Sequence, residues 1–545
     1  MPPAGALATA SRPALLRRLG EERFDLAVIG GGITGAGLAR EAALRGLKVA
    51  LLEARDFASG TSSRSSKLIH GGLRYLAMGD VALVRSSALE RKVIHRIAPH
   101  LAEPRWMVVP AKGYAGLMKL RAGITAYEKL GAVEETDLHR NWSKRELAEH
   151  EPLLRRDRFA HACVYREYLT DDARLVLANL RAAVAAGAVA LNHAPVVEIC
   201  SDAAAADGLV AECSFSGERV RVRARAVVNA AGPWVDAVRR LEAPEATSSR
   251  LLLSKGVHIV VAADRLPVRH LIILQTEDRR SIFVIPRGRA VYIGTTDTVY
   301  EPGVETEPPI TAGDVDYLLA PVNRDLDLRP LAPEDVSAAW AGLRPLIAEP
   351  GKEPSEISRK DEVWVGPRRV VTIAGGKLTG YRPMARMTLE RTAEVVGLAP
   401  AEPPPEGEEP RLPGGDFAGE VEGLAAELGR EGVARDVAER LAALYGAEAR
   451  EVLARGSEPL VAGGEVVAGE VAWAVEVEAA ATLEDVLVRR TRASLYSPGE
   501  REALIPVLAE RLATALGWDA ARREREQAAA RALQAQELRF REESS

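Results

Sequence analysis

The chain has 545 residues, which is more than one ordinary domain needs and fits two to four domains. Hydrophobic residues make up 47% of it and charged residues 27%, a balance typical of a folded globular protein and not of a disordered one. The net charge of −5 excludes a globally basic nucleic-acid-binding protein, and we expect no nucleic-acid partner.

The cysteine content and the hydropathy of the chain indicate the cellular compartment in which we expect the protein. Cys163, Cys200 and Cys213 have neither a CxxC pair nor metal-ligand spacing, so we expect no disulfide framework, no metal and a reducing, cytoplasmic location. No apolar run is long enough to span a bilayer, although attachment to a membrane surface stays open. Residues 1–22 start with an arginine-containing stretch that lacks the apolar core of a secretory signal, and we expect a floppy N-terminal extension there.

The first regular unit is predicted just after this extension. The apolar run FDLAVI at residues 24–29 indicates a buried strand, residues 33–44 indicate a helix, and residues 48–53 indicate a second strand. Such a β-α-β unit is typical of a parallel sheet.

A GxGxxG pattern lies between the first strand and the helix. Gly30 permits the tight turn, Gly32 lets a pyrophosphate approach the backbone, and Gly35 lets the helix and strand pack closely. The helix N-terminus attracts phosphates, and Glu53 at the end of the second strand can accept hydrogen bonds from ribose hydroxyls. The unit predicts a dinucleotide site, with NAD and FAD both open.

The rest of the chain changes character twice. Strand-like runs at 227–229, 257–261, 282–285, 291–293 and 370–373 alternate with helical runs such as 172–186, which indicates an α+β region that supplies a substrate pocket. Residues 399–415 (APAEPPPEGEEPRLPGG) are too rich in proline and glycine for a regular element and predict a linker. The pattern after the linker is helical, for example at 433–453 and at 518–543, and we interpret the second stretch as a solvated surface helix.

Residues 61–76, TSSRSSKLIHGGLRYL, follow the β-α-β unit. Hydroxyls crowd around Lys67, His70 and Arg74, and the glycines Gly71 and Gly72 remove side chains between them. This composition suits a backbone that lies against a flat ring system with polar edges.

At this point the sequence resembles the FAD-dependent glycerol-3-phosphate dehydrogenases, within the larger group of flavoproteins similar to D-amino-acid oxidase. The resemblance covers residues 24–515. Besides 61–76, it rests on AVIGGGITGAGLAREAALRGL at 27–47, DDARLVLAN at 171–179, VVNAAGPW at 227–234, SKGVHIVV at 254–261, FVIPRGRAVYIGTTD at 283–297, AGLRPL at 341–346, AGGKLTGYR at 374–382 and RRT at 489–491.

The resemblance implies a fold of mixed α/β and α+β class. We expect a Rossmann-like FAD-binding domain with an inserted mixed-sheet substrate domain at 23–398, then the linker at 399–415, then an all-helical C-terminal domain at 416–545. The implied cofactor is FAD. The residues implied to bind it are Gly30, Gly32, Ile33, Thr34, Gly35, Glu53, Ser62, Ser63, Ser66, Lys67, Leu68, His70, Gly71, Gly72, Gly232, Trp234, Gly376, Lys377, Leu378 and Thr379.

The implied reaction is oxidation of sn-glycerol 3-phosphate to dihydroxyacetone phosphate, with hydride transfer to the flavin. Arginine forks are suited to a phosphate, and Arg74, Arg344 and Arg359 match pocket positions of the family, as does Tyr75. We expect Arg344 and Arg359 to bind the phosphate and hydroxyls, and Arg74 to lie between the phosphate and the flavin.

Two further residues are implied to take part in the chemistry together with Arg344 and Arg74. His258 matches a pocket histidine and is the expected general base, against the alternative of a core histidine with satisfied hydrogen bonds. Lys377 is expected to bind substrate and to stabilise negative charge on the reduced flavin or on the substrate oxygen, two roles that the sequence does not separate.

The chain has no haem or iron–sulfur spacing, so an outside electron acceptor is needed. The resemblance implies a membrane quinone and peripheral attachment to the cytoplasmic face of the membrane, and it leaves a homodimer open. The basic stretch 111–131 has the composition of an interfacial helix, and a core-facing helix with a basic outer side is the alternative. The competing functions are a glycerol-3-phosphate oxidase that uses O2, another amine or hydroxy-acid oxidase of the same group, and a flavin-binding protein without turnover.

Overall fold

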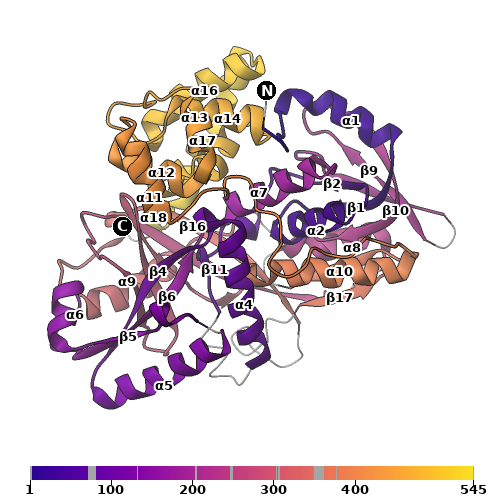
Figure 1. The fold of residues 1–545 in the computed structure, drawn as a ribbon. Helices are drawn as coiled ribbons and strands as arrows, with labels where there is room; N and C mark the ends of the chain where they lie inside the picture. The colour runs from indigo at the N-terminus through magenta and orange to yellow at the C-terminus, as the bar shows by residue number, and fades with distance from the viewer. Residues whose placement is uncertain are drawn as a thin grey trace.

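Two β-sheets and a C-terminal group of helices form the architecture of the computed structural model (Figure 1). The structure describes residues 3–71, 81–131, 133–202, 205–245, 249–301, 303–304, 307–348, 361–375 and 377–543. The mixed sheets and the helical C-terminal part confirm the predicted fold class.

The first sheet has a parallel centre. Its strands run in the order β17 (Glu362–Val365), β18 (Val371–Ala374), β10 (Arg219–Asn229), β1 (Arg23–Ile29), β2 (Val49–Leu52) and β7 (Val189–Leu191), and β9 (Ala206–Glu212) joins β10 to β8 (Val196–Ser201). The strands β18, β10, β1, β2 and β7 are parallel to one another, whereas β17 and β9 pair antiparallel with β18 and β10. The predicted β-α-β unit is confirmed as β1, α2 (Ile33–Leu44) and β2.

Helices cover both faces of this sheet. Side chains of α2, α7 (Asp172–Ala185) and α10 (Tyr381–Val396) pack against Leu26 and Val28 on one face. On the other face, Leu16 and Leu19 of α1 (Arg12–Glu21) pack against the strands. The expectation of a floppy N-terminal extension is therefore wrong for residues 3–22, because the leucine spacing of this short helix lets it bury an apolar side on the sheet.

The second sheet is large and mostly antiparallel. It runs in the order β15 (Thr298–Val299), β11 (Leu251–Ala262), β14 (Ala290–Gly294), β13 (Ser281–Arg287), β12 (Leu271–Gln275), β4 (Glu103–Ala111), β6 (His161–Leu169) and β3 (Leu68–Ile69), with β16 (Val336–Ile347) paired to β11 and β5 (Arg140–Trp142) paired to β6. Further helices belong to this part of the molecule or to the edges of the first sheet. They are α4 (Val81–Ile97), α5 (Tyr114–Leu130), α6 (Lys144–His150), α8 (Val235–Glu242) and α9 (Ala312–Asp325).

Residues 397–420, all of them described, contain no helix or strand, as the proline and glycine content predicted. The segment is nevertheless packed, since Leu412 is buried and its N–H donates to the Ile97 carbonyl at 2.8 Å. It leads across the molecule to the C-terminal helices, drawn in orange and yellow in Figure 1.

The C-terminal region is helical throughout. Its helices are α11 (Val421–Arg430), α12 (Arg435–Tyr445), α13 (Ala449–Leu453), α14 (Ala468–Val477), α15 (Ala493–Tyr496), α16 (Arg501–Leu516), α17 (Ala520–Glu537) and α18 (Phe540–Glu543), with a π-helical turn at Asp485–Arg490. The single helix expected at 518–543 is interrupted before α18. The stretch is only partly exposed to solvent, because Ala530 and Phe540 are buried against neighbouring elements.

Candidate active site

A cavity of about 360 Å³ lies at the carboxyl ends of β1, β2 and β10. Open α/β sheets bind their ligands at this edge, where loops leave the strands in different directions. The cavity brings together ten of the predicted cofactor residues, which are Gly30, Gly32, Ile33, Thr34, Glu53, Ser62, Gly232, Trp234, Lys377 and Leu378.

The glycine-rich turn leaves no room for larger residues. Gly30 has φ +111°, and a Cβ there would lie 2.6 Å from the Ala230 carbonyl oxygen. A Cβ on Gly35 would lie 2.0 Å from the carbonyl oxygen of Gly30, so helix α2 can pack this closely on the turn only with glycine at that position. The first residues of α2, Ile33 and Thr34, line the cavity, which gives a phosphate access to the helix N-terminus.

Glu53 forms one wall of the cavity at the end of β2. Its carboxylate accepts hydrogen bonds from the Gly31 N–H at 2.6 Å and from the Arg55 N–H at 2.9 Å. Enclosure by protein raises the pKa of Glu53, and these two hydrogen bonds oppose the rise. The glycine cradle, the helix N-terminus and this carboxylate fit a dinucleotide cofactor such as FAD, with the pyrophosphate at α2 and a ribose at Glu53.

The segment 61–71 borders the same cavity, but its side chains divide into two groups. Ser62 faces the cavity and accepts a hydrogen bond from the Ile33 N–H at 3.0 Å. Lys67 points away from it, into a buried ion pair with Asp172 at 3.1 Å. Burial, and after it the charge of Arg492, lowers the pKa of Lys67 to about 7, against the opposing effect of Asp172.

His258 lies on β11 next to this segment and is fully enclosed. Its Nε2 lies 2.9 Å from the Ser66 Oγ, and its ring stacks on Trp340 with 4.7 Å between ring centroids and 7° between planes. The Nδ1 atom has no hydrogen-bond partner within the described part of the chain. Burial, with Lys67 and Arg344 adding to it, holds the pKa of His258 well below its usual range, so the imidazole is neutral at neutral pH.

Arg344 lies on β16, opposite Ser254 of β11. Its guanidinium donates to Asp297 at 3.2 Å and to the Thr295 hydroxyl at 3.0 Å. A Cβ on Gly256 would overlap this guanidinium, so that glycine makes the room in which it lies. Pro345, the next residue, lines the cavity.

Lys377 marks the other end of the cavity. Its Nζ donates to the Ser87 hydroxyl at 2.7 Å and to the Gly71 carbonyl at 3.2 Å. Asp361, which the sequence analysis missed, faces this ammonium beside Gly375, and burial raises its pKa to about 7 while Lys377 opposes the rise. The pair places two titratable groups at this end of the cavity.

The remaining predicted residues fall into two groups. Gly35, Ser63, Ser66, Lys67, Leu68, His70, Gly71 and Thr379 are described but do not line the cavity, although Thr379 donates to the His70 carbonyl at 3.2 Å. The predicted residues Gly72, Arg74, Tyr75, Arg359 and Gly376 lie outside the described residues.

Several cavity residues were not predicted from the sequence, among them Arg55, Gly60, Val196, Pro345 and Met384. Gly60 is required by close packing, because a Cβ there would lie 2.8 Å from the Trp234 ring. This contact is visible only in the structure. Val196 and Met384 are ordinary apolar residues in a strand and a helix, and nothing in their local sequence distinguishes them from core residues.

Helix α5, within the basic stretch 111–131, packs on the core with one side and is exposed on the other, which confirms the core-facing alternative and leaves the interfacial role a prediction. Leu117, Ile124 and Tyr127 are buried, as in a core-facing helix, whereas Tyr114 is 67% exposed and Met118 is 40% exposed. Among the described residues, no helix is both long and apolar enough to cross a membrane.

Comparison with known proteins gives a consistent family. A model described as FAD dependent oxidoreductase matches residues 25–381, and one described as the C-terminal domain of alpha-glycerophosphate oxidase matches residues 406–523. The aerobic glycerol-3-phosphate dehydrogenase of Staphylococcus haemolyticus is 43% identical over 384 residues, which cover 70% of this chain and 69% of that protein.

Solved structures extend the likeness to nearly the whole chain. The glycerol-3-phosphate dehydrogenase from Bacillus halodurans, complexed with FAD, is 34% identical with a TM-score of 0.79, over 97% of this chain and 98% of that one. The L-alpha-glycerophosphate oxidase from Mycoplasma pneumoniae, with FAD bound, is 18% identical with a TM-score of 0.54, over 72% of this chain and 99% of that one, and this likeness shows the fold alone.

Proposed function

Given that the chain belongs to the family of FAD-dependent glycerol-3-phosphate dehydrogenases, we propose that it oxidises sn-glycerol 3-phosphate to dihydroxyacetone phosphate. The observation that carries the proposal is the cavity lined by both Glu53 and Lys377, together with the buried His258 on β11 and the partly exposed Arg344 on β16 beside it. Bound FAD would accept the two electrons that leave the substrate as a hydride.

The residues of the chain would supply the remaining steps. Oxidation of the secondary alcohol releases the hydroxyl proton and transfers the hydrogen on C2 as a hydride. When Nε2–H of His258 donates to Ser66 Oγ, the enclosed Nδ1 carries a free lone pair. This atom would take the hydroxyl proton of a substrate that reaches it, and the lowered pKa keeps it unprotonated before substrate binds.

The positive charges would hold the substrate and its developing charge. Arg344 offers a planar fork to the phosphate, in exchange for part of its contact with Asp297. Lys377 would stabilise negative charge on the substrate oxygen or on the flavin edge. Arg74, Tyr75 and Arg359 remain proposed substrate ligands on the resemblance alone.

We also propose a membrane quinone as the electron acceptor. Tyr127 of α5 donates from its hydroxyl to Glu167, and its oxygen accepts from the Gly71 N–H at 3.0 Å, so the inner side of this helix contacts the segment next to Lys377. The outer side exposes Tyr114 and Met118. It also exposes Lys119, Arg121 and Lys129, and Lys112 is exposed just before the helix. The one acid of the stretch, Glu128, is buried against His139.

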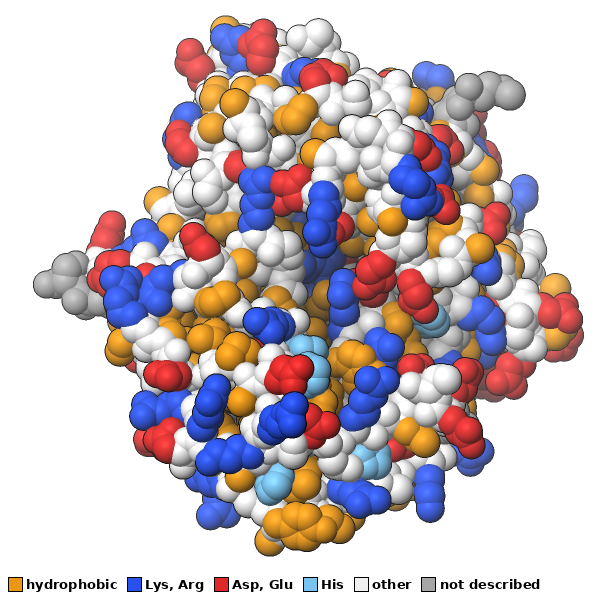
Figure 2. Space-filling model, turned by 60° about the vertical axis from the view of Figure 1, so that its left-hand side comes forward, with side chains coloured by type: hydrophobic (Ala, Val, Ile, Leu, Met, Phe, Trp, Pro, Cys, Tyr) orange, Lys and Arg blue, Asp and Glu red, His pale blue; other side chains and the backbone are white. Residues whose placement is uncertain are grey.

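A peripheral contact with anionic lipid would use such a surface. Lys and Arg side chains are frequent over the lower part of the face in Figure 2, with acids between them. Attachment to the cytoplasmic face of the membrane is therefore part of the proposal.

Anaerobic reduction tests the function directly. The purified protein should be yellow, should release FAD and not FMN on denaturation, and should lose its flavin absorbance when glycerol 3-phosphate is added without oxygen. Glycerol and a panel of amino acids should leave the flavin oxidised. A flavin that is bleached by an amino acid and not by glycerol 3-phosphate would contradict the proposal, and reoxidation rates with a quinone and with O2 would separate the dehydrogenase from an oxidase.

A further inference from the structure

The loop that borders the cofactor cavity contacts the C-terminal region on the side that faces away from the cavity. Residues 54–67 connect the end of β2 to β3, and Ala54, Arg55, Gly60 and Thr61 of this loop line the cavity. Its opposite side meets arginines of the 485–492 stretch, which belongs to the C-terminal region.

Arg492 makes the deepest of these contacts. Its guanidinium donates to Asp172 at 2.8 Å, to Asp171 at 3.0 Å and to the Ser63 carbonyl at 3.3 Å, and every one of the three side chains is fully buried. Asp172 in turn accepts from the Ser65 hydroxyl at 2.7 Å and from Lys67 at 3.1 Å. One carboxylate therefore ties a C-terminal arginine to two residues of the cavity loop.

The same loop residues lead to the proposed base. The Lys67 ammonium lies 4.7 Å from the centroid of the Trp340 ring, on which the His258 imidazole is stacked. Ser66, between Ser65 and Lys67, lies at hydrogen-bond distance from His258 Nε2. A displacement of the loop at Ser65 and Lys67 would displace both partners of the imidazole.

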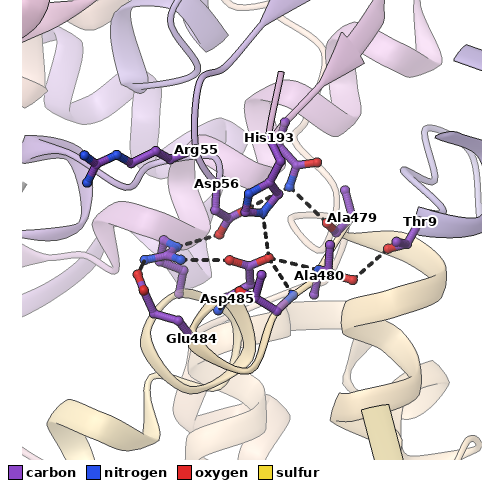
Figure 3. A network of polar contacts seen from close by, with 12 residues as sticks. Thr9, Arg55, Asp56, His193, Ala479, Ala480, Glu484 and Asp485 are labelled. Carbon is purple, nitrogen blue, oxygen red and sulfur yellow. Dashed lines mark hydrogen bonds and ion pairs between the residues drawn. The ribbon is translucent and has the colours of Figure 1, made fainter. Parts of the chain in front are cut away.

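A second anchor lies at the other end of the loop. Asp56 accepts a two-bond fork from Arg490 at 2.6 and 2.8 Å and a further bond from Arg489 at 2.5 Å. Figure 3 shows Asp56 beside His193 and Asp485, whose carboxylate lies 3.0 Å from His193 Nε2. These three side chains could hold a metal ion by their spacing, but the arginines already neutralise both carboxylates.

The backbone at this contact is unusual. Ala58, Lys67, His193, Ala479 and Arg492 all have positive φ angles, which residues with a Cβ adopt rarely. Such conformations persist where the surrounding structure determines them strongly, and they gather at functional sites.

We propose that Arg492 is a positioning residue of the active site, which fixes the cofactor loop through Asp172 and thereby orients Lys67, Trp340 and the imidazole of His258. The C-terminal helical region is then a structural part of the FAD site. The effect on turnover rests on the proposed function, whereas the effect on FAD binding does not.

The test compares Arg492→Gln with Arg181→Gln in the full-length protein. Arg181 on α7 makes a two-bond ion pair with Glu448 of the C-terminal region, at 2.6 and 2.7 Å, but it contacts no residue of the cavity loop in the described structure. Both changes remove arginine–carboxylate hydrogen bonds between α7 and the C-terminal region, so both should lower the melting temperature.

Only Arg492→Gln should change the cofactor site. We expect the dissociation constant of FAD, titrated into apoprotein by flavin fluorescence, to rise about tenfold, which corresponds to about 1.4 kcal/mol. The visible flavin spectrum should shift, and the rate of anaerobic flavin reduction at saturating substrate should fall about tenfold, with a smaller change in the substrate concentration at half saturation. Equal effects of the two changes on FAD binding, or none from either, would overturn the proposal.

Arg492→Lys covers the case in which the glutamine variant does not fold. A lysine keeps the charge but cannot reach Asp171, Asp172 and the Ser63 carbonyl together. The FAD affinity of this variant should therefore lie between those of the parent and the glutamine variant. Where only the lysine variant folds, its FAD affinity should be measurably weaker than that of the parent. Parental FAD affinity and spectrum in a folded Arg492→Lys protein would contradict the proposal. If the parental flavin is not reduced by glycerol 3-phosphate, the proposed function fails, while the FAD titration still decides the role of Arg492.

Discussion

At the scale of single residues, the site contains charges that are wholly or largely enclosed and have partners already in place. Arg344 contacts Asp297 and Thr295, and Lys377 contacts Ser87 and Gly71. Burying such groups is tolerable because each one is paired, and removal of one partner leaves the other charge uncompensated. Substitutions at these positions therefore report on binding and on the loss of a buried pair together.

Arg344→Ala should lower kcat/KM for glycerol 3-phosphate by about one to two decades, since a hydrogen bond to a charged group contributes about 1.5–3 kcal/mol. Arg344→Lys should recover only part of this, because an ammonium cannot form the two parallel bonds of the fork. Steady-state kinetics with glycerol 3-phosphate and with glycerol measure the effect.

Two comparisons make this prediction specific. Glycerol, a poor substrate without a phosphate, should be affected far less than glycerol 3-phosphate, and equal losses on both would place Arg344 at the reacting hydroxyl or in the fold. Arg250→Ala is a surface control from the residue just before β11. Its side chain is half exposed, pairs with Glu362 at 3.6 Å and lies over the Trp364 ring, and the change should alter kcat/KM by less than about threefold.

At the scale of elements, α5 has two different sides. Tyr127 on its inner side is buried and contacts Arg91 at 2.7 Å and Glu167 at 3.0 Å, which fixes the helix on the second sheet. Its outer side presents the three cations Lys119, Arg121 and Lys129 with exposed Tyr114 and Met118. The helix can therefore contact a membrane surface without losing its packing.

Reversal of two outer charges, Lys119→Glu with Arg121→Glu, should weaken binding to vesicles that contain anionic lipid by more than tenfold, since each cation near such a surface contributes about 1 kcal/mol. Reduction of a soluble dye should be nearly unchanged, because neither side chain lines the cavity. Vesicle co-sedimentation and dye turnover measure the two effects.

The matched control reverses the same charge at another place. Arg219→Glu with Arg221→Glu changes two exposed cations on β10, on the first sheet, and should leave vesicle binding close to that of the parent. Equal weakening by both double changes would mean that only net charge matters. Vesicle binding that is insensitive to salt would also contradict a role for these cations.

At the scale of the whole molecule, the buried histidine His100 makes the stability of the folded protein sensitive to acid. His100 lies between the linker, at Gly414, and Arg174 of α7, which itself pairs with Glu478 of the C-terminal region. Burial, and then Arg174, lowers the pKa of His100 to about 3. The folded protein therefore keeps this imidazole neutral where the unfolded chain would protonate it.

The sign of the pH effect follows from this difference. Below pH 6.5 the unfolded state binds the proton and the folded state does not, so His100 lowers the free energy of unfolding by up to about 1.4 kcal/mol for each further pH unit, until pH approaches 3. His100→Gln cannot bind this proton, and its free energy of unfolding should decline less steeply between pH 6 and 4.5. Urea unfolding at several pH values measures the two slopes, and parallel slopes would contradict the assignment.

The sequence by itself determined the β-α-β unit, the glycine turn and the linker. Each depends on residues that are close in the chain: the apolar run at 24–29, the spacing of Gly30, Gly32 and Gly35, and the prolines of 399–415. Local preference and steric exclusion are enough to specify such features. The family motifs added the expected cofactor and substrate, which periodicity does not encode.

Only the tertiary structure decided how distant residues meet. Lys67 was expected to bind the cofactor, but its side chain turns toward Asp172, and Arg492 reaches the same carboxylate from 320 positions further along the chain. No local pattern specifies such a pairing, because it depends on which helices the folded core brings together. For the same reason the N-terminal helix was mistaken for a floppy extension, and α5 was resolved into an inner and an outer side only by what it packs against.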